Sequence, residues 1–257
     1  MNVPHTRAMP LRSRTKLSVN LNKVATLRNT RGVGIPSVVR CGVICLEAGA
    51  HGLTVHPRPD QRHIRPGDVT DLATLLTGFP AAEFNIEGNP FLGVVEHVEA
   101  VRPTQCTLVP DDPSQATSDH GWDLAKEGAR LEPVVRRLRD LGSRVSLFMD
   151  AEPTAMRLAK AVGADRVELY TEPFAAAFSQ GDPAPVVAKF KEASLAAAEA
   201  GLGVNAGHDL SQRNLSTFLD GVPGVLEVSI GHALIAEALE DGLAETVRRY
   251  RRIAWGP

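Results

Sequence analysis

The stretch VSLFMDAEPTAMRLAKAVGADRVELYT, residues 145–171, contains the structural unit that decides the fold. It begins with a short apolar run, VSLFMD (145–150), and ends with a second one, RVELYT (166–171). A longer segment of helical character separates the two runs. Short apolar runs that alternate with helical segments are typical of a parallel sheet built from strand–helix units. This stretch therefore predicts an α/β protein.

The same alternation extends in both directions along the chain. The strand candidates are LSVNL (17–21), GLTVH (52–56), EFNIE (83–87), CTLVP (106–110), VSLFMD (145–150), RVELYT (166–171), GVNAG (203–207) and LEVSIG (226–231). Eight strands in strict alternation with about as many helices indicate a closed (β/α)8 TIM barrel. A doubly wound open sheet usually has a glycine-rich turn after its first strand, and no GxGxxG follows the first strand here.

Several connecting segments carry helix signals. Segment 36–49 has Pro36 at a first helical position and Gly49 as a C-terminal stop. Segments 126–141 and 233–250 place their apolar residues on one helical face, which should pack on the barrel.

Two connections exceed the usual length and are expected to be loops near the site. They are 22–35, which includes TRGVGIP (30–36), and 111–124. Long connections in compact domains often act as functional lids. A third connection, 171–183, is expected to hold a short extra helix.

Length and charge restrict the organisation and the partners. The 257 residues match a single barrel domain of about 250 residues. We expect residues 1–16 to form a flexible extension and residues 17–257 to form the catalytic barrel. A net charge of -2 provides no basic field for a nucleic acid or an anionic membrane surface.

The location is predicted from the cysteines and from the hydropathy pattern. Cys41, Cys45 and Cys106 have no paired CxxC spacing, so they indicate reduced thiols rather than a disulfide framework or a zinc site. No run approaches the roughly 18 apolar residues of a membrane span, and the N-terminal stretch lacks the apolar region of a signal peptide. A cytoplasmic protein is expected.

Polar side chains stand at the carboxyl ends of most predicted strands, the face that carries the active site in barrels. They are Asn20, Asn22, Lys23, His56, Arg58, Glu87, Glu168, Asn205, His208 and His232. A single polar residue there can be only a cap or a loop contact. Buried Glu87 and Glu168 would be costly unless paired or functional. His56 and His208 are either core histidines bound to backbone groups or acid/base groups that work near neutral pH.

Three segments have the composition of phosphate sites. NAGHD (205–209) and SIGHA (229–233) follow the last two strands, where barrels often bind phosphate through backbone N–H groups and a helix N-terminus. The segment HPRPDQRH (56–63) offers arginines suited to phosphate oxygens. The alternative is that the two glycine-containing segments are simple turns.

From about residue 17 to the end, the chain contains the motifs NLNKVATLRNTRG, GLTVHPRPDQRHI, FNIEG, LVPDDPSQATS, VSLFMDAE, RVELYT, VNAGHDL and SIGHALI. In their order and spacing they resemble the pyridoxine 5'-phosphate synthase family of vitamin B6 biosynthesis. The resemblance implies a condensation of 1-deoxy-D-xylulose 5-phosphate with 3-amino-2-oxopropyl phosphate, without a metal or another cofactor. It also implies a homo-oligomer, often an octamer in this family.

The resemblance further implies a role for individual residues. His56 and Glu87 match general bases, His208 a proton donor and Glu168 a transition-state stabiliser. The positions that match binding of the amino-ketone phosphate are Asn20, Arg31, Gly231 and His232. Those that match binding of the sugar phosphate are Asn22, Lys23, Arg58, His63 and Thr117.

The chain departs from the better-known family pattern in three places. Asn22-Lys23 replaces Asp-His after the first strand, and Asp209 replaces a glycine. Asp209 is expected at the substrate or, alternatively, as the cap of a helix that begins near Ser211. The third place is Ser118, Asp119 and His120, where Thr, Glu and Gly are more familiar.

Other functions remain open on the same barrel. A metal-dependent sugar-phosphate epimerase could draw its ligands from Glu87, Glu168 and His208. A Schiff-base aldolase needs a lysine in the barrel, and Lys23 is the candidate near the mouth. A non-catalytic barrel that binds phosphorylated metabolites is the non-enzymatic alternative.

Overall fold

The computed structural model describes residues 14–115 and 117–255. Residues 1–16 were predicted to form a flexible extension, and the first 13 of them lie outside the described residues. Lys16 already belongs to the first strand.

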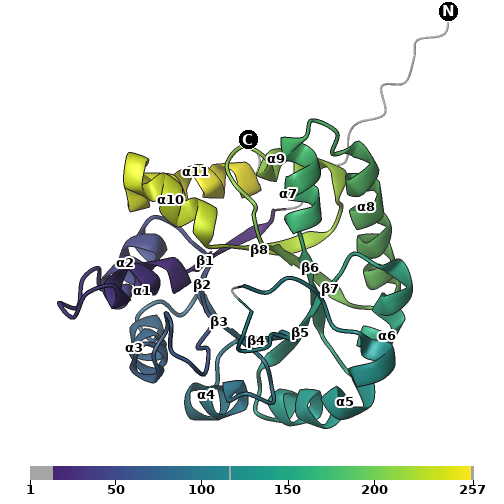
Figure 1. The fold of residues 1–257 in the computed structure, drawn as a ribbon, viewed down its shortest axis with the longest axis horizontal. Coiled ribbons are helices and arrows are strands. Elements are labelled where there is room, and N and C mark those ends of the chain that lie inside the picture. The colour runs from purple at the N-terminus through teal and green to yellow at the C-terminus, as the bar shows by residue number, and fades with distance from the viewer. Residues whose placement is uncertain (1–13, 116, 256–257) are drawn as a thin grey trace, which may run out of the picture.

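Eight parallel strands form a closed barrel in which each strand pairs with its neighbours in the sequence and the last pairs with the first (Figure 1). They are β1 (Lys16–Asn20), β2 (Gly52–Val55), β3 (Glu83–Gly88), β4 (Gln105–Leu108), β5 (Arg144–Met149), β6 (Arg166–Tyr170), β7 (Gly203–Gly207) and β8 (Val225–Ile230). The predicted (β/α)8 barrel is confirmed.

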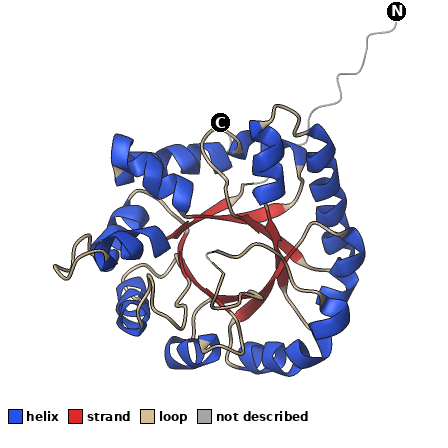
Figure 2. Ribbon diagram, in the orientation of Figure 1, coloured by secondary structure: helices blue, strands red, loops and turns tan. Residues whose placement is uncertain are grey.

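Helices surround the barrel on its outside (Figure 2). They are α1 (Asn22–Asn29), α2 (Val38–Glu47), α3 (Pro66–Leu76), α4 (Val94–Val101), α5 (Leu124–Asp140), the 3-10 helix η1 (Pro153–Ala155), α6 (Met156–Ala161), α7 (Glu172–Ser179), α8 (Ala184–Glu199), α9 (Leu215–Gly221), α10 (His232–Asp241) and α11 (Leu243–Trp255). The extra helix expected within 171–183 is α7.

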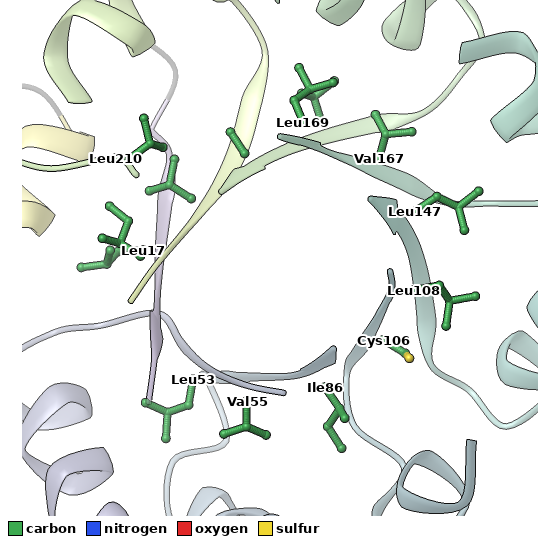
Figure 3. Close-up of a cluster of buried hydrophobic side chains, with 14 of the residues drawn as sticks. Leu17, Leu53, Val55, Ile86, Cys106, Leu108, Leu147, Val167, Leu169 and Leu210 are labelled. Carbon is green, nitrogen blue, oxygen red and sulfur yellow. The ribbon is translucent and has the colours of Figure 1, made fainter. Parts of the chain in front are cut away.

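The apolar core lies between the strands and the ring of helices. Figure 3 shows Leu17, Leu53, Ile86, Leu147 and Val167 pointing out of the barrel, and all five are fully buried. Successive side chains of a strand point to opposite faces of the sheet, so the strand residues next to these five point into the lumen.

The lumen is polar. It contains the buried side chains Ser18, Thr54, Asn85, Thr107 and Ser146. The Ser18 and Thr54 hydroxyls lie 2.7 Å apart, and Thr107 Oγ1 donates to Asn85 Oδ1 at 3.1 Å. Ser18, Thr54, Asn85 and Thr107 therefore hydrogen-bond to one another, whereas the buried Ser146 hydroxyl has no hydrogen-bond partner among the described residues. These polar groups extend toward the carboxyl ends of the strands.

The prediction that residues 22–35 form a loop is wrong for the first half of the segment, because residues 22–29 form α1. This helix buries Val24 and Ala25, and it also buries Arg28, whose guanidinium forms an ion pair with Asp68. The ion pair lets a helix with few apolar residues pack tightly, which the periodicity could not reveal. The remaining part, 30–37, projects outward between α1 and α2 at the left of Figure 1.

Two helix boundaries also differ from those predicted. Helix α2 begins after Ser37, whose Oγ accepts a hydrogen bond from the Arg40 N–H, and not at Pro36. The predicted helix 233–250 is two helices, α10 and α11. Gly242, with φ +81°, separates them, since this left-handed conformation is readily adopted only by glycine.

The mouth loop, residues 109–123, connects β4 to α5. It passes in front of the barrel lumen in Figure 2. Arg62 donates hydrogen bonds from two guanidinium nitrogens to the carbonyl oxygens of Gln115 and Pro113, both at 2.8 Å. The described residues of the mouth loop, 109–115 and 117–123, form neither helix nor strand. The predicted loop 111–124 is therefore confirmed for these residues up to Asp123, since α5 begins at Leu124, and the mouth loop is fixed to the segment after β2.

None of the helices in the described part of the chain is both long and apolar enough to cross a membrane.

Candidate active site

A cavity of about 390 Å³ opens at the carboxyl ends of the strands. Its walls come from the ends of β1, β2, β3, β6, β7 and β8 and from the mouth loop. The polar lining residues are Asn20, Asn22, Lys23, Thr26, His56, Arg58, Arg62, His63, Glu87, Thr117, Ser118, Glu168, His208, Asp209, Ser229 and His232. A polar cavity of this size can hold small phosphorylated molecules.

Hydrogen bonds link the first three strand ends to one another. Asn20 Oδ1 accepts from the Asn22 N–H at 2.9 Å, and Asn22 Oδ1 accepts from the His56 N–H at 2.9 Å. Asn20 Nδ2 also donates to Glu87 Oε2 at 3.3 Å. The two asparagines therefore set the positions of His56 and Glu87.

The two glutamates that point into the cavity favour their neutral forms. Burial, together with the charge of Glu168, raises the pKa of Glu87 well above its usual range. Burial and the charge of Glu227, which lies deeper in the lumen, raise the pKa of Glu168 to about 8. Raised pKa values of this kind are typical of carboxyl groups at functional sites.

His56, His63 and His208, three of the four histidines that line the cavity, also favour their neutral forms. Burial, followed by the nearby Arg58 guanidinium, holds the pKa of His56 well below its usual range. The same two causes lower the pKa of His63 to about 4. Burial lowers the pKa of His208, although Asp209 and Asp111 oppose the shift. A neutral imidazole can accept a proton.

His208 is held in an unusual place. Its backbone φ is +80°, and φ of Asp209 is +55°, so two consecutive non-glycine residues adopt the left-handed conformation. The imidazole ring packs against Phe148 and Tyr170, each with ring centroids 5.3 Å away. Backbone strain at a cavity often accompanies function.

Helix α10 begins at the cavity. Gly231 lies between β8 and α10, and His232 and Ala233 belong to the first turn of α10; all three line the cavity. The first N–H groups of a helix lack partners within it and attract anions. A Cβ on Gly231 would lie 3.1 Å from Asn20 Cβ, so the close approach of β1 favours glycine here.

The structure brings together all the predicted site residues except Arg31 and Asn205. Asn205 is buried away from the cavity, where its side chain accepts from Arg166 at 2.9 Å and donates to Gln105 Oε1 at 3.3 Å. Arg31 lies on the outward-projecting connection 30–37, and it does not line the cavity. The predicted alternative that Asp209 caps a helix near Ser211 is wrong. Helix α9 begins at Leu215, and Asn214 accepts a hydrogen bond from the Ser211 N–H through its Oδ1 at 2.8 Å.

Asp111 is the main residue that the sequence reading missed. It is buried, and its carboxylate contacts Arg58 and accepts a hydrogen bond from Ser118 Oγ at 2.8 Å. The signal was a carboxylate directly after a strand end, in the quoted motif LVPDDPSQATS. Its ion-pair partner Arg58 lies in another loop, so the role of Asp111 was not visible from spacing.

Among residues 14–115 and 117–255, no three His, Cys, Asp or Glu side chains are arranged as a metal-binding group.

The fold and the cavity define a (β/α)8-barrel protein with a polar site at the carboxyl ends of its strands. Solved structures share this fold. Thiamine phosphate pyrophosphorylase from Pyrococcus furiosus matches with a TM-score of 0.62 at 14% identity, covering 95% of this chain and 97% of that one. The 3-keto-L-gulonate-6-phosphate decarboxylase from Vibrio cholerae matches with a TM-score of 0.62 at 9% identity, covering 95% and 100%.

The sequence comparisons are more specific. Residues 17–255 match the family model described as pyridoxal phosphate biosynthesis protein PdxJ. The chain is 58% identical over 243 residues to a pyridoxine 5'-phosphate synthase from Albidiferax ferrireducens, covering 93% of this chain and 96% of that one. It is 57% identical over 249 residues to one from Xanthomonas campestris, covering 94% and 97%. The chain belongs to the PdxJ family.

Proposed function

We propose that this protein is a pyridoxine 5'-phosphate synthase. It condenses 1-deoxy-D-xylulose 5-phosphate with 3-amino-2-oxopropyl phosphate, and it releases inorganic phosphate and water. The observation that carries the proposal is the cavity itself, where two buried carboxyl groups and four histidines surround one space beside a helix N-terminus. The high identity to relatives of this name supports it.

The chemistry requires several proton transfers in one place. The amine of one substrate attacks the ketone of the other, water leaves, and protons must then move on and off carbon and oxygen before the ring closes. In our assignment His56 and Glu87 accept protons, His208 donates one, and Glu168 stabilises the transition state. Groups with shifted pKa values around a shared cavity are suited to such a sequence.

The substrates themselves change the proton balance of the cavity. A bound ammonium group favours the ionised form of a nearby carboxyl group, so the amino-ketone prepares Glu87 to accept a proton. A bound phosphate favours the charged form of a nearby imidazole, so it prepares His208 to donate one. Each group thus reaches its working form when the cavity is filled.

Two parts of the wall are assigned to the two phosphates. The start of α10, with Gly231 and His232, holds the phosphate of the amino-ketone together with Asn20. Arg58, His63, Thr117, Asn22 and Lys23 hold the sugar phosphate, with Asp209 at the edge. Lys23 keeps a positive charge where the better-known pattern has histidine, and both can pair with an anion. Arg31 lies outside the cavity of a single chain, so the structure offers no support for its assignment to the amino-ketone phosphate.

The experiment is a product assay with the purified protein. Both substrates are mixed with the protein in the presence of a chelator, and pyridoxine 5'-phosphate is detected by mass spectrometry. Product that requires both substrates and survives the chelator supports the proposal. Folded protein that gives no product contradicts it, and epimerisation of a sugar phosphate that needs added metal would establish the alternative function.

We extend the proposal to a cytoplasmic homo-oligomer. Cys41, Cys45 and Cys106 are free thiols, which suits a reducing compartment. Val33, Ile35 and Leu239 are strongly exposed apolar side chains, and such side chains can be covered in an assembly. Light scattering coupled to size-exclusion chromatography tests the oligomer, and a monomeric mass at assay concentration contradicts it.

A further inference from the structure

Asp111 is a buried carboxylate of the mouth loop, shortly after the end of β4 at Leu108. Only 4% of the residue is exposed. Burial of a charge is costly unless the charge is paired, so the contacts of Asp111 indicate its purpose.

The main partner of Asp111 is Arg58, from the segment after β2. The Arg58 guanidinium forms an ion pair with Oδ2 of Asp111, and its other terminal nitrogen donates to the Gln115 carbonyl oxygen. Arg58 is itself only 5% exposed and lines the cavity. Two directed contacts fix the plane of the guanidinium, which is a rigid fork of N–H donors.

The same carboxylate also organises the mouth loop. Ser118 Oγ donates to Asp111 Oδ2 at 2.8 Å, and Asn89 Nδ2 donates to the Asp111 carbonyl oxygen at 3.0 Å. Ser118 lines the cavity as well. The Asp111 carboxylate therefore connects the segment after β2 to the far side of the mouth loop, while its main-chain carbonyl is held by Asn89 at the end of β3.

We infer that Asp111 is a positioning residue: its carboxylate holds Arg58 and the mouth loop in the arrangement that receives the sugar phosphate. The inference rests on the proposed function, which assigns Arg58 to that phosphate. A guanidinium fixed before binding loses less conformational freedom when the substrate arrives, so affinity is gained without a direct contact from Asp111.

The sign of the change in sugar-phosphate affinity distinguishes a positioning role of Asp111 from a purely electrostatic one. A carboxylate near a phosphate repels it, so removal of the charge alone would tighten binding. Loss of positioning weakens binding instead. The variant Asp111→Asn keeps the size of the side chain and removes the charge, and we expect the Kd for 1-deoxy-D-xylulose 5-phosphate to rise about tenfold.

A double-mutant cycle tests whether Asp111 acts through Arg58. The Kd is measured by calorimetry for the wild type, Asp111→Asn, Arg58→Ala and the double variant, with the sugar phosphate alone. We expect the double variant to bind as weakly as Arg58→Ala, because no guanidinium remains to be positioned. Additive losses, or tighter binding by Asp111→Asn, overturn the inference.

Further variants keep the test decisive if Asp111→Asn does not fold. Ser118→Ala removes one hydrogen bond to the carboxylate and should raise the Kd about threefold, while Asp111→Glu keeps the charge and should recover part of the affinity. Unchanged binding by Ser118→Ala, or no recovery by Asp111→Glu, overturns the inference. Asp140→Asn is the control for the same chemical change, because Asp140 is exposed at the end of α5, outside the mouth loop and the cavity, and its Kd should equal that of the wild type.

The failure of this inference is distinct from the failure of the proposed function. Calorimetry needs no turnover, so it reports on Asp111 even in the absence of product. A wild-type protein that makes no pyridoxine 5'-phosphate counts against the proposed function, whereas unchanged sugar-phosphate affinity in Asp111→Asn counts against the role of Asp111.

Discussion

Gly207, the last residue of β7, lies directly against Glu168 of β6. A Cβ built on Gly207 would lie 2.4 Å from Oε1 of Glu168 and 3.3 Å from the Ser229 carbonyl oxygen. The absence of a side chain at position 207 thus leaves the space that the carboxyl group occupies.

Gly207→Ala is therefore expected to displace the Glu168 carboxyl group while that group remains present in the protein. We expect kcat to fall by about 10- to 100-fold, since small displacements of catalytic groups have effects of this size. Steady-state assays with both substrates provide the measurement. Gly67→Ala is the control, because nothing lies within 4 Å of a Cβ at that position. Equal activities of the two variants would show that the Glu168 position does not matter.

The neutral form of Glu168 predicts a pH dependence of stability. Its pKa is raised to about 8 by burial and by Glu227, whereas an unfolded chain has an ordinary value of about 4.3. Between these two values the folded state holds a proton that the unfolded state has lost. The contribution of Glu168 to stability is therefore fully present below the lower value and is lost as pH rises through the higher one.

Glu168→Gln removes this dependence while keeping the shape of the side chain. The wild type should lose stability between pH 5 and pH 8 through Glu168, and the variant should not. The free energy of unfolding of the variant minus that of the wild type should therefore increase over this range, as measured by urea denaturation at several pH values. Glu172→Gln, at the start of α7, serves as a comparison on the same strand–helix unit. A difference between Glu168→Gln and wild type that stays constant with pH would contradict the neutral carboxyl.

The backbone at Asp209 predicts a stabilising substitution. Its φ of +55° costs free energy for most residues with a side chain, and the side chain also brings a carboxylate to the cavity. Asp209→Gly should raise the free energy of unfolding by up to about 1 kcal/mol. It should also lower KM for a phosphorylated substrate, because a repelling charge is removed.

Arg102→Gly separates these two effects. Arg102 has φ +45° at the end of α4, away from the cavity. The same relief of strain is expected there with KM unchanged. Thermal unfolding and steady-state kinetics of both variants give the comparison, and a KM that rises in Asp209→Gly would mean that the carboxylate helps to bind substrate.

The strands were the most predictable part of the fold. The run GVNAG (203–207) coincides with β7, and RVELYT (166–171) differs from β6 by one residue. Buried parallel strands are short and apolar, so the sequence itself marks their ends. Helix α1 was missed because its burial depends on the ion pair of Arg28 with Asp68, which no local pattern encodes.

The candidate site was predictable to the extent that strand ends define it. Glu87, Glu168, His56 and His208 follow from their places at the ends of strands, and the family resemblance supplied their roles. Asp111 was not predicted as a site residue, because its role depends on the ion pair with Arg58, which lies 53 residues earlier in the chain. Loop-to-loop contacts of this kind become visible only in three dimensions.

The most direct test of the account compares Glu87→Gln with Glu96→Gln in the product assay. Glu87 is buried at the cavity, whereas Glu96 is exposed on α4, so the two variants make the same chemical change in different places. We expect Glu87→Gln to lower the rate of pyridoxine 5'-phosphate formation by about 100-fold or more, while Glu96→Gln matches the wild type. Equal rates for Glu87→Gln and the wild type would contradict the assignment of this cavity as the active site.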